Sequence, residues 1–148
     1  MQRFHIRHRR GLTLVELMMV CTLIGLVAGI AVPRAGTMLD ALRLSQASHE
    51  VAAAVTLARA AAIRRGAYAR LIVDTARGEV RIEAGLDTLH RRSVGAMHRV
   101  ILRASRDTIT YAPNGLGYGV ANSTIVIAIG ARAETVTVSR LGRMRRSW

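Results

Sequence analysis

The sequence has no lysine, few acids and a single cysteine. All 22 basic residues are arginine and nine residues are acidic, so the formal net charge is +13. A charge of this size favours anionic partners such as phosphate backbones or lipid headgroups. Cys21 has no second cysteine to pair with, so an intrachain disulfide is excluded and cysteine usage says nothing about the redox compartment.

The sequence also lacks the patterns that mark common active sites. Nucleophile-elbow, phosphate-loop and dinucleotide-binding motifs are absent. No pair of histidines has metal-ligand spacing on an element that the sequence pattern predicts. We therefore expect no enzyme activity, no metal site and no cofactor.

A basic head precedes a long apolar run. The head contains Arg3, Arg7, Arg9 and Arg10 and no acid. From Leu17 to Val32 the only polar residue is Thr22. About 20 apolar residues cross a bilayer as a helix, and the positive-inside rule keeps the basic head in the cytoplasm. This predicts a single-pass protein of the inner membrane with a periplasmic or external C-terminal domain.

Glu16 is an acid within this apolar segment. A carboxylate in a membrane helix costs several kcal/mol and is usually kept for a function, with a partner. A cut just before Leu12 would supply that partner, since the new α-amine of one subunit could neutralise Glu16 of its neighbour. An ordinary secretory signal peptide cut near Gly29-Ile30-Ala31 is the alternative, although Glu16 and Pro33 fit it poorly.

The stretch Gly11-Leu12-Thr13-Leu14-Val15-Glu16-Leu17 resembles the class III signal motif of type IV prepilins and type II secretion pseudopilins. The resemblance implies that prepilin peptidase cuts between Gly11 and Leu12 and methylates the amine of Leu12. Glu16 then becomes the fifth residue of the mature chain, where the family keeps its glutamate. Leu12 departs from the phenylalanine that the family prefers after the cut.

The remaining chain predicts a helix followed by a sheet. Leu44, Val51, Val55, Ala58 and Ala62 share one helical face. We expect one helix from about Leu12 to Arg65, kinked at Pro33 and capped by Gly66. Strands are then predicted at 68–73, 79–84, 99–104, 109–111, 124–129 and 135–139, with another possible at 88–92 inside the ambiguous region 85–97. The glycine-rich segment 113–119 fits a structural loop better than a phosphate cradle, since no helix pattern follows it.

Three later motifs resemble the GspH/FimT family of minor pseudopilins and minor pilins. They are Leu57-Ala58-Arg59-Ala60-Ala61-Ala62-Ile63-Arg64-Arg65-Gly66, Tyr111-Ala112-Pro113-Asn114-Gly115, and Val136-Thr137-Val138-Ser139-Arg140-Leu141-Gly142-Arg143. The resemblance implies an α+β pilin-like fold, in which a long kinked N-terminal helix packs on a C-terminal antiparallel β-sheet head. The predicted parts are a leader (1–11), a membrane or filament-core half-helix (12–33), an amphipathic half-helix (34–66), a β-rich head (67–139) and a basic tail (140–148).

The C-terminal tail is rich in arginine. It contains Arg140, Arg143, Arg145 and Arg146 and ends at Trp148. Arginines contact phosphates without sequence preference, and a tryptophan can stack on a base. In some type IV pilus members of the family that the chain resembles, a Gly-Arg-x-Arg tail binds DNA during uptake, and Gly142, Arg143 and Arg145 match that form. A solvated basic end is the alternative.

Three functional hypotheses follow. The chain is a minor subunit that primes assembly of a type IV pilus or a type II secretion pseudopilus, with prepilin peptidase and other pilins as partners. Alternatively, the same scaffold presents its tail to DNA. In the third hypothesis the chain is a single-pass membrane protein that never enters a filament and is not cut after Gly11.

Overall fold

The computed structural model describes residues 13–119 and 121–147, and they form two compact units that divide between Met38 and Leu39. Helix α1 (Leu14–Arg65) contributes to both units. The predicted cleavage site, Gly11 and Leu12, and the terminal Trp148 lie outside the described residues.

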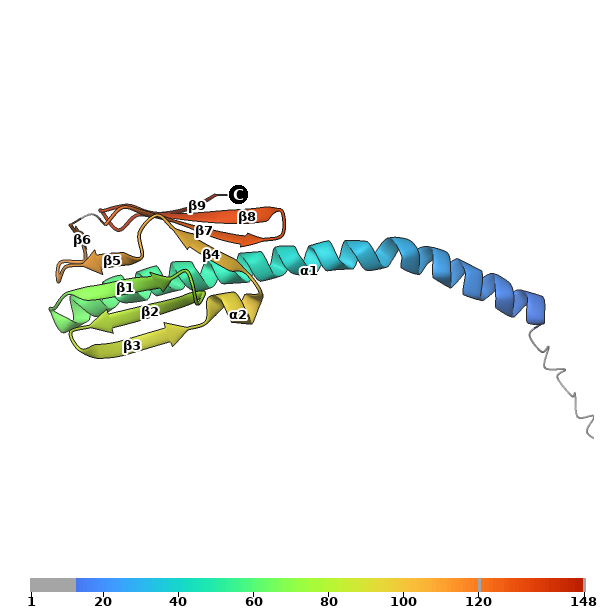
Figure 1. The fold of residues 1–148 in the computed structure, drawn as a ribbon, viewed down its shortest axis with the longest axis horizontal. Coiled ribbons are helices and arrows are strands. Elements are labelled where there is room, and N and C mark those ends of the chain that lie inside the picture. Colours follow the sequence, from blue (N-terminus) through green and yellow to red (C-terminus); the bar gives the residue numbers. More distant parts are fainter. Residues whose placement is uncertain (1–12, 120, 148) are drawn as a thin grey trace, which may run out of the picture. The chain divides into compact units, whose positions relative to one another are not determined.

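The second unit contains two antiparallel sheets beside the C-terminal part of α1 (Figure 1). The first sheet, which we call sheet A, has the order β3-β2-β1-β5-β6. Its strands are β1 (Ala69–Asp74), β2 (Glu79–Ala84), β3 (Asp87–Arg92), β5 (Thr108–Tyr111) and β6 (Gly117–Tyr118). The second, sheet B, has the order β4-β7-β8-β9. Its strands are β4 (Ile101–Ala104), β7 (Ser123–Ile129), β8 (Arg132–Val138) and β9 (Met144–Ser147). A short helix, α2 (Val94–His98), lies between β3 and β4.

One helix face and the inner faces of both sheets form a single core. The predicted face of α1 is confirmed, because Leu44, Val51, Val55, Ala58 and Ala62 are all buried. Alternate strand residues meet them, including Leu71, Val80, Ile82, Ile109 and Tyr111 from sheet A and Leu102, Ile125, Ile127, Val136 and Val138 from sheet B. The alanines on this helix face let strands approach closely, and the apolar area removed from water supplies the main stabilising term.

Helix α1 ends at Arg65, directly before Gly66, as the sequence predicts. Gly66 adopts a positive φ of 58°, and the amide of Ala67 donates to the carbonyl of Ala62 at 3.3 Å. A glycine in the left-handed conformation with this bond is a common helix C-cap. Pro33 lies inside α1, which is assigned as one helix from Leu14 to Arg65.

Several elements differ from those predicted. The ambiguous region contains β3 and also α2, which the pattern did not indicate because the helix has only five residues. Strand β4 begins at Ile101 instead of Arg99, because Arg99 has a φ of 56° as the C-cap of α2. Within the predicted tail, residues 144–147 form β9, which pairs with β8.

Candidate functional site

The first unit is an apolar helix whose side chains are exposed. The segment of α1 near the N-terminus has a mean hydropathy of 2.3 over 18 residues and is 0% buried, so it is long and apolar enough to cross a membrane. Thr22, a polar residue within this apolar segment, has a local hydrogen-bond partner: its hydroxyl donates to the carbonyl of Met18 at 2.7 Å. Such a bond lowers the cost of a hydroxyl in hydrocarbon.

Glu16 lies in the first turn of α1. The amide of Glu16 donates to the Thr13 hydroxyl at 3.2 Å, so Thr13 acts as a helix N-cap. The spacing Thr13-x-x-Glu16 is that of a capping box, a local role for the glutamate that the sequence interpretation had not weighed. Within residues 13–119 and 121–147, no basic side chain forms an ion pair with Glu16.

The three family-like motifs of the second unit converge on Arg59. Two glycine turns lie against this side chain. A Cβ on Gly115 would lie 2.7 Å from Ile63 Cδ1 and 3.2 Å from Arg59 Nε, and a Cβ on Gly142 would lie 3.0 Å from Arg59 Nη1. Both glycines have a φ of 75°, which other residues rarely adopt. Arg59 therefore packs beneath the β5–β6 turn and the β8–β9 turn, where any larger residue would crowd it.

These two turns are built by short-range hydrogen bonds. In the first, Gly115 donates to the carbonyl of Ala112 at 2.8 Å, and Leu116 donates to the side chain of Asn114 at 3.0 Å. The segment 113–119, predicted as a structural loop, therefore contains a hairpin turn and also the short strand β6, which pairs with β5. In the second turn, the amide of Arg143 donates to the Ser139 hydroxyl at 3.2 Å, and this turn sends the chain into β9.

Tyr111 belongs to one of these motifs and is fully buried. No described residue hydrogen-bonds to its hydroxyl. Burial raises the pKa of Tyr111 above 10.0, and the charge of Arg59 acts in the opposite direction.

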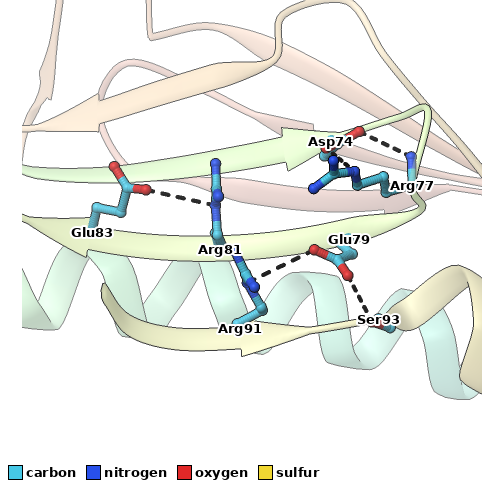
Figure 2. Close-up of polar contacts among 7 residues, drawn as sticks. All are labelled: Asp74, Arg77, Glu79, Arg81, Glu83, Arg91 and Ser93. Carbon is cyan, nitrogen blue, oxygen red and sulfur yellow. Dashed lines mark hydrogen bonds and ion pairs between the residues drawn. The ribbon is translucent and has the colours of Figure 1, made fainter. Parts of the chain in front are cut away.

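The acids of the second unit are concentrated on and around sheet A. Figure 2 shows Glu79 between Arg91 and Ser93, Glu83 beside Arg81, and Asp74 beside Arg77. At the same β3 edge but on the inner face of the sheet, Glu50 of α1 accepts from Arg92 Nε at 3.0 Å and lies 2.8 Å from His98 Nε2. Every arginine from Arg65 to Arg92 pairs with an acid in this way.

The arginines that follow are different. The eight arginines from Arg99 to Arg146 are all exposed, and none forms an ion pair with a described residue. They are Arg99, Arg103, Arg106, Arg132, Arg140, Arg143, Arg145 and Arg146. Only two acids, Asp107 and Glu134, occur in the same part of the chain. Uncompensated positive charge therefore gathers on and around sheet B.

Strand β9 separates the candidate DNA-binding arginines by face. Arg146 pairs in register with Val136, whose side chain is in the core, whereas Arg145 pairs with Thr137, whose side chain is exposed. Because residues directly opposite each other point to the same side, Arg145 belongs to the outer face of sheet B and Arg146 to the inner side of its edge. Arg140 and Arg143 lie in the turn before the strand.

Glu134 is the one acid on the inner face of sheet B. Its side chain is 3% exposed, and no described residue donates to its Oε1. It lines a cavity of about 340 Å³ together with Met144, Arg145, Arg146 and Ser147. Arg146 is diagonal to Glu134 across the β8–β9 pair, within reach of a long side chain. The sequence interpretation missed Glu134; the strand alternation that buries Val136 and Val138 was the available signal.

A long apolar N-terminal helix that continues into a core with antiparallel sheets is the architecture of type IV minor pilins. Comparison with solved structures supports this class. Two crystal forms of the type IV minor pilin FimU of Pseudomonas aeruginosa superpose with TM-scores of 0.60 and 0.62. They are 14% and 15% identical, cover 70% of this chain, and are covered to 92% and 87% of their own length.

Sequence comparison identifies the family. Residues 6–32 match the prokaryotic N-terminal methylation motif, and residues 47–142 match the family described as type II transport protein GspH. The pilin-like protein PilA1 of Thermus thermophilus is 31% identical over 154 aligned positions, which cover 93% of this chain and 97% of that protein. The chain therefore belongs to the GspH family of pilin-like proteins. Proteins of this kind are structural subunits that assemble with other pilins and are not enzymes.

Proposed function

We propose that the chain is a minor subunit of a type IV pilus or of a type II secretion pseudopilus, and that it primes filament assembly. Before assembly it crosses the inner membrane once, with its β-rich unit in the periplasm. Prepilin peptidase cuts between Gly11 and Leu12 and methylates Leu12. The apolar part of α1 then leaves the membrane for the filament, where Pro33 kinks the helix.

The observation that carries this proposal is a carboxylate on an otherwise apolar, exposed helix. Glu16 has no ion-pair partner among the described residues, and a charge in a dry filament core needs one. The new α-amine at Leu12 of an adjacent subunit supplies an opposite charge and fixes the axial register. Burial of the apolar side chains between neighbouring helices supplies the bulk of the assembly energy.

The processing step is tested by mass spectrometry of the native N-terminus. We expect a chain that begins at Leu12 and carries one methyl group. Gly11→Ala should leave the precursor intact, which appears as a heavier band. A native chain that keeps its basic head, or that begins after Ala31, would refute the cleavage proposal.

The assembly step is tested by recovery in sheared filaments. Glu16→Ala should be processed normally but incorporated poorly. Thr13→Ala is the matched control, because it removes the N-cap and leaves the carboxylate in place. If both variants lose incorporation equally, Glu16 acts through the capping box; normal incorporation of Glu16→Ala would refute the proposal.

A second candidate function is DNA binding by Arg140, Arg143, Arg145, Arg146 and Trp148. Arg140, Arg143, Arg145 and Arg146 form no ion pair with a described residue, whereas the arginines of sheet A are already neutralised by acids, and this difference favours DNA binding. The mature chain from Leu12, which lacks the four arginines of the basic head, should bind duplex DNA with a steep salt dependence. Replacing Arg143 and Arg145 together by alanine should abolish binding while the circular dichroism spectrum stays unchanged; equal binding by the double variant would exclude the tail.

A further inference from the structure

Large apolar side chains are exposed together at the end of the second unit where α1 stops, and β6 lies beside this end (Figure 1). They come from the end of α1, the residues just after it, the β5–β6 hairpin and the β8–β9 turn, and each is 42–63% exposed: Ile63, Tyr68, Leu116, Tyr118 and Leu141. The rings of Tyr68 and Tyr118 meet edge to face, with their centroids 4.9 Å apart. Ile63 lies against Gly115 of the hairpin. Single exposed apolar residues are ordinary, but a cluster of them marks an interaction surface.

The β5–β6 hairpin and the β8–β9 turn enclose a hollow of about 460 Å³ within this surface. Its apolar wall comes from Leu116, Tyr118 and Leu141, and its polar groups come from Asn114 and Arg140. Its two sides are bonded to each other, because the amide of Gly117 donates to the carbonyl of Arg140 at 2.8 Å. The amide of Arg140 in turn donates to Asn122 Oδ1 at 2.7 Å. The fold therefore holds the hollow in place, and the hollow is large enough to take an apolar side chain of a partner.

Around this hollow the chain has arginines but no acid. Residues 57–68, 112–123 and 139–143 contain no aspartate or glutamate. Arg65 is paired with Asp87 of β3, whereas Arg140 is exposed and forms no ion pair with a described residue. A partner that complements this surface therefore brings both an apolar side chain and a carboxylate.

A second copy of this chain does not have that chemistry. The same surface of a second copy would place one Arg140 against another, and like charges brought together oppose association. The acids Glu79 and Glu83 on sheet A of a second copy are already paired with arginines. Nucleic acid fits poorly as well, because the exposed leucines offer its phosphates no hydrogen-bond donor. The surface therefore fits a different protein subunit.

We propose that the hollow between Leu116, Tyr118 and Leu141 docks a different subunit of the same filament, which inserts an apolar side chain and pairs a carboxylate with Arg140. Tyr68 supports the ring of Tyr118 from the side. Tyrosine and arginine are among the residue types most enriched at the centres of protein interfaces. This inference rests on the proposed filament function, and it assigns Arg140 to a protein partner instead of DNA.

The test is photo-cross-linking in the cells that make the protein, measured on sheared filaments. A benzophenone amino acid takes the place of Tyr118, which keeps an aromatic ring at the hollow. In a parallel sample it takes the place of Ala76, an exposed residue in the β1–β2 turn. We expect an adduct with a second polypeptide only from the position of Tyr118. Peptide mass spectrometry should identify that polypeptide as another pilin-like subunit with its own methylated N-terminus.

Second substitutions in the same chain identify the contacts. Arg140→Ala and Leu141→Ser should each lower the adduct yield about three- to tenfold, because each removes one of the two recognition contacts. Arg140→Lys should keep most of the yield, since the charge remains. Arg132→Ala and Met97→Ser are the matched controls, because they remove an exposed arginine and an exposed apolar side chain elsewhere on the unit, and the yield should not change. Thermal unfolding confirms that each variant is folded.

The outcomes separate this inference from the function beneath it. An adduct with a second copy of the chain, with DNA or with lipid would overturn the inference, as would an adduct whose yield both Arg140→Ala and Leu141→Ser leave unchanged. If filaments contain the chain but yield no adduct, the docking surface is refuted and the filament function stands. If the unsubstituted chain is missing from sheared filaments, the filament function itself fails.

Discussion

Arg59 packs against two turns of the second unit, the β5–β6 turn and the β8–β9 turn. Its guanidinium lies under Gly115 and Gly142, and its Nε is buried without a hydrogen-bond partner among the described residues. A charged group is kept in such a place when its stem and its planar head fill space that no smaller side chain fills. The motifs that suggested the family are therefore parts of one packing arrangement around this side chain.

Replacing Arg59 by alanine should destabilise the second unit by roughly 1–3 kcal/mol, because it leaves a void beneath both turns. Urea unfolding of the full chain in detergent measures the change. Arg64→Ala is the control, since Arg64 is an exposed arginine one to two turns further along α1 and should change stability by less than about 0.5 kcal/mol. Equal effects of the two variants would show that Arg59 does not support the turns.

The buried hydroxyl of Tyr111 predicts how the stability of the fold changes at alkaline pH. Burial raises the pKa of its hydroxyl in the folded chain above 10.0, so the folded state holds the proton more tightly than the unfolded state. The stability linked to this group is complete below about pH 10 and is lost as the pH rises toward the folded pKa. Tyr111→Phe should remove this part of the alkaline loss, measured as thermal midpoints between pH 8 and 11.

At neutral pH the same substitution should cost little. The Tyr111 hydroxyl has no partner among the described residues, so removing it relieves an unsatisfied buried group, and we expect a change within about 1 kcal/mol. A loss of several kcal/mol at pH 7 would mean that the hydroxyl makes a hydrogen bond after all.

At the level of elements, α2 is held by a close backbone approach. A Cβ on Gly95 would lie 3.0 Å from the Cα of Gly78 in the β1–β2 turn and 3.1 Å from the carbonyl oxygen of Val100. The amide of Gly95 also donates to the carbonyl of Gly78 at 2.9 Å. Two glycines are needed here because the two backbones touch.

Gly95→Ala should therefore destabilise the protein by roughly 1–3 kcal/mol. Helix propensity alone predicts the opposite sign, since alanine is favoured over glycine by about 1 kcal/mol inside a helix. Thermal unfolding of Gly95→Ala beside Met97→Ala, whose side chain in α2 is 56% exposed, measures the difference. A gain in stability on Gly95→Ala would show that the turn and the helix separate easily.

The elements predicted from the sequence are those whose signal is local. The face of α1 from Leu44 to Ala62 follows a period of 3.6, and the β1–β2 hairpin has a turn between two alternating strands. Pairings between distant segments, such as β1 with β5, could not be predicted, because the sequence of one strand does not indicate which other strand it pairs with. The five residues of α2 are too few to show a helical period. All four residues of β9 are exposed, so its sequence lacks the alternation of a half-buried strand and was interpreted as a basic tail.

The candidate sites also divide into those with a local sequence signal and those that depend on tertiary packing. Glu16 was predicted from sequence because a charge in an apolar run stands out wherever the chain folds. Arg59 could not be distinguished from other charged residues, because its importance depends on burial that tertiary packing creates. For Glu134 the alternation of β8 was a signal, but it does not show that the carboxylate lacks a partner among the described residues. The face assigned to Arg145 depends on its register with Thr137, which also requires the fold.

At the scale of the whole molecule, the two units are stabilised in different ways: the N-terminal unit needs an apolar environment, whereas the C-terminal unit has its own core. The N-terminal unit is a helix whose backbone bonds are internal and whose apolar side chains need lipid, detergent or other helices. The C-terminal unit has its own core. Their unfolding should therefore be separable.

Heating the full chain in detergent should melt the C-terminal unit cooperatively while the helix of the N-terminal unit persists. We expect residual ellipticity at 222 nm after the near-ultraviolet signal of Tyr111 and its neighbours is lost, because detergent continues to solvate the apolar helix. Full loss of helical signal in one transition would show that the apolar segment depends on the second unit for its structure.

Among the described strands, β9 is bonded on one side only, since it ends the order β4-β7-β8-β9. An open strand edge is a template on which a second chain can add, and charged side chains along such an edge oppose this addition. Arg145 and Arg146 repel the same edge of another copy. Neutralising them, whether by substitution or by about 1 M salt, removes that repulsion. The protein should then self-associate through this edge, so its solubility depends on the same charges that a polyanion would bind.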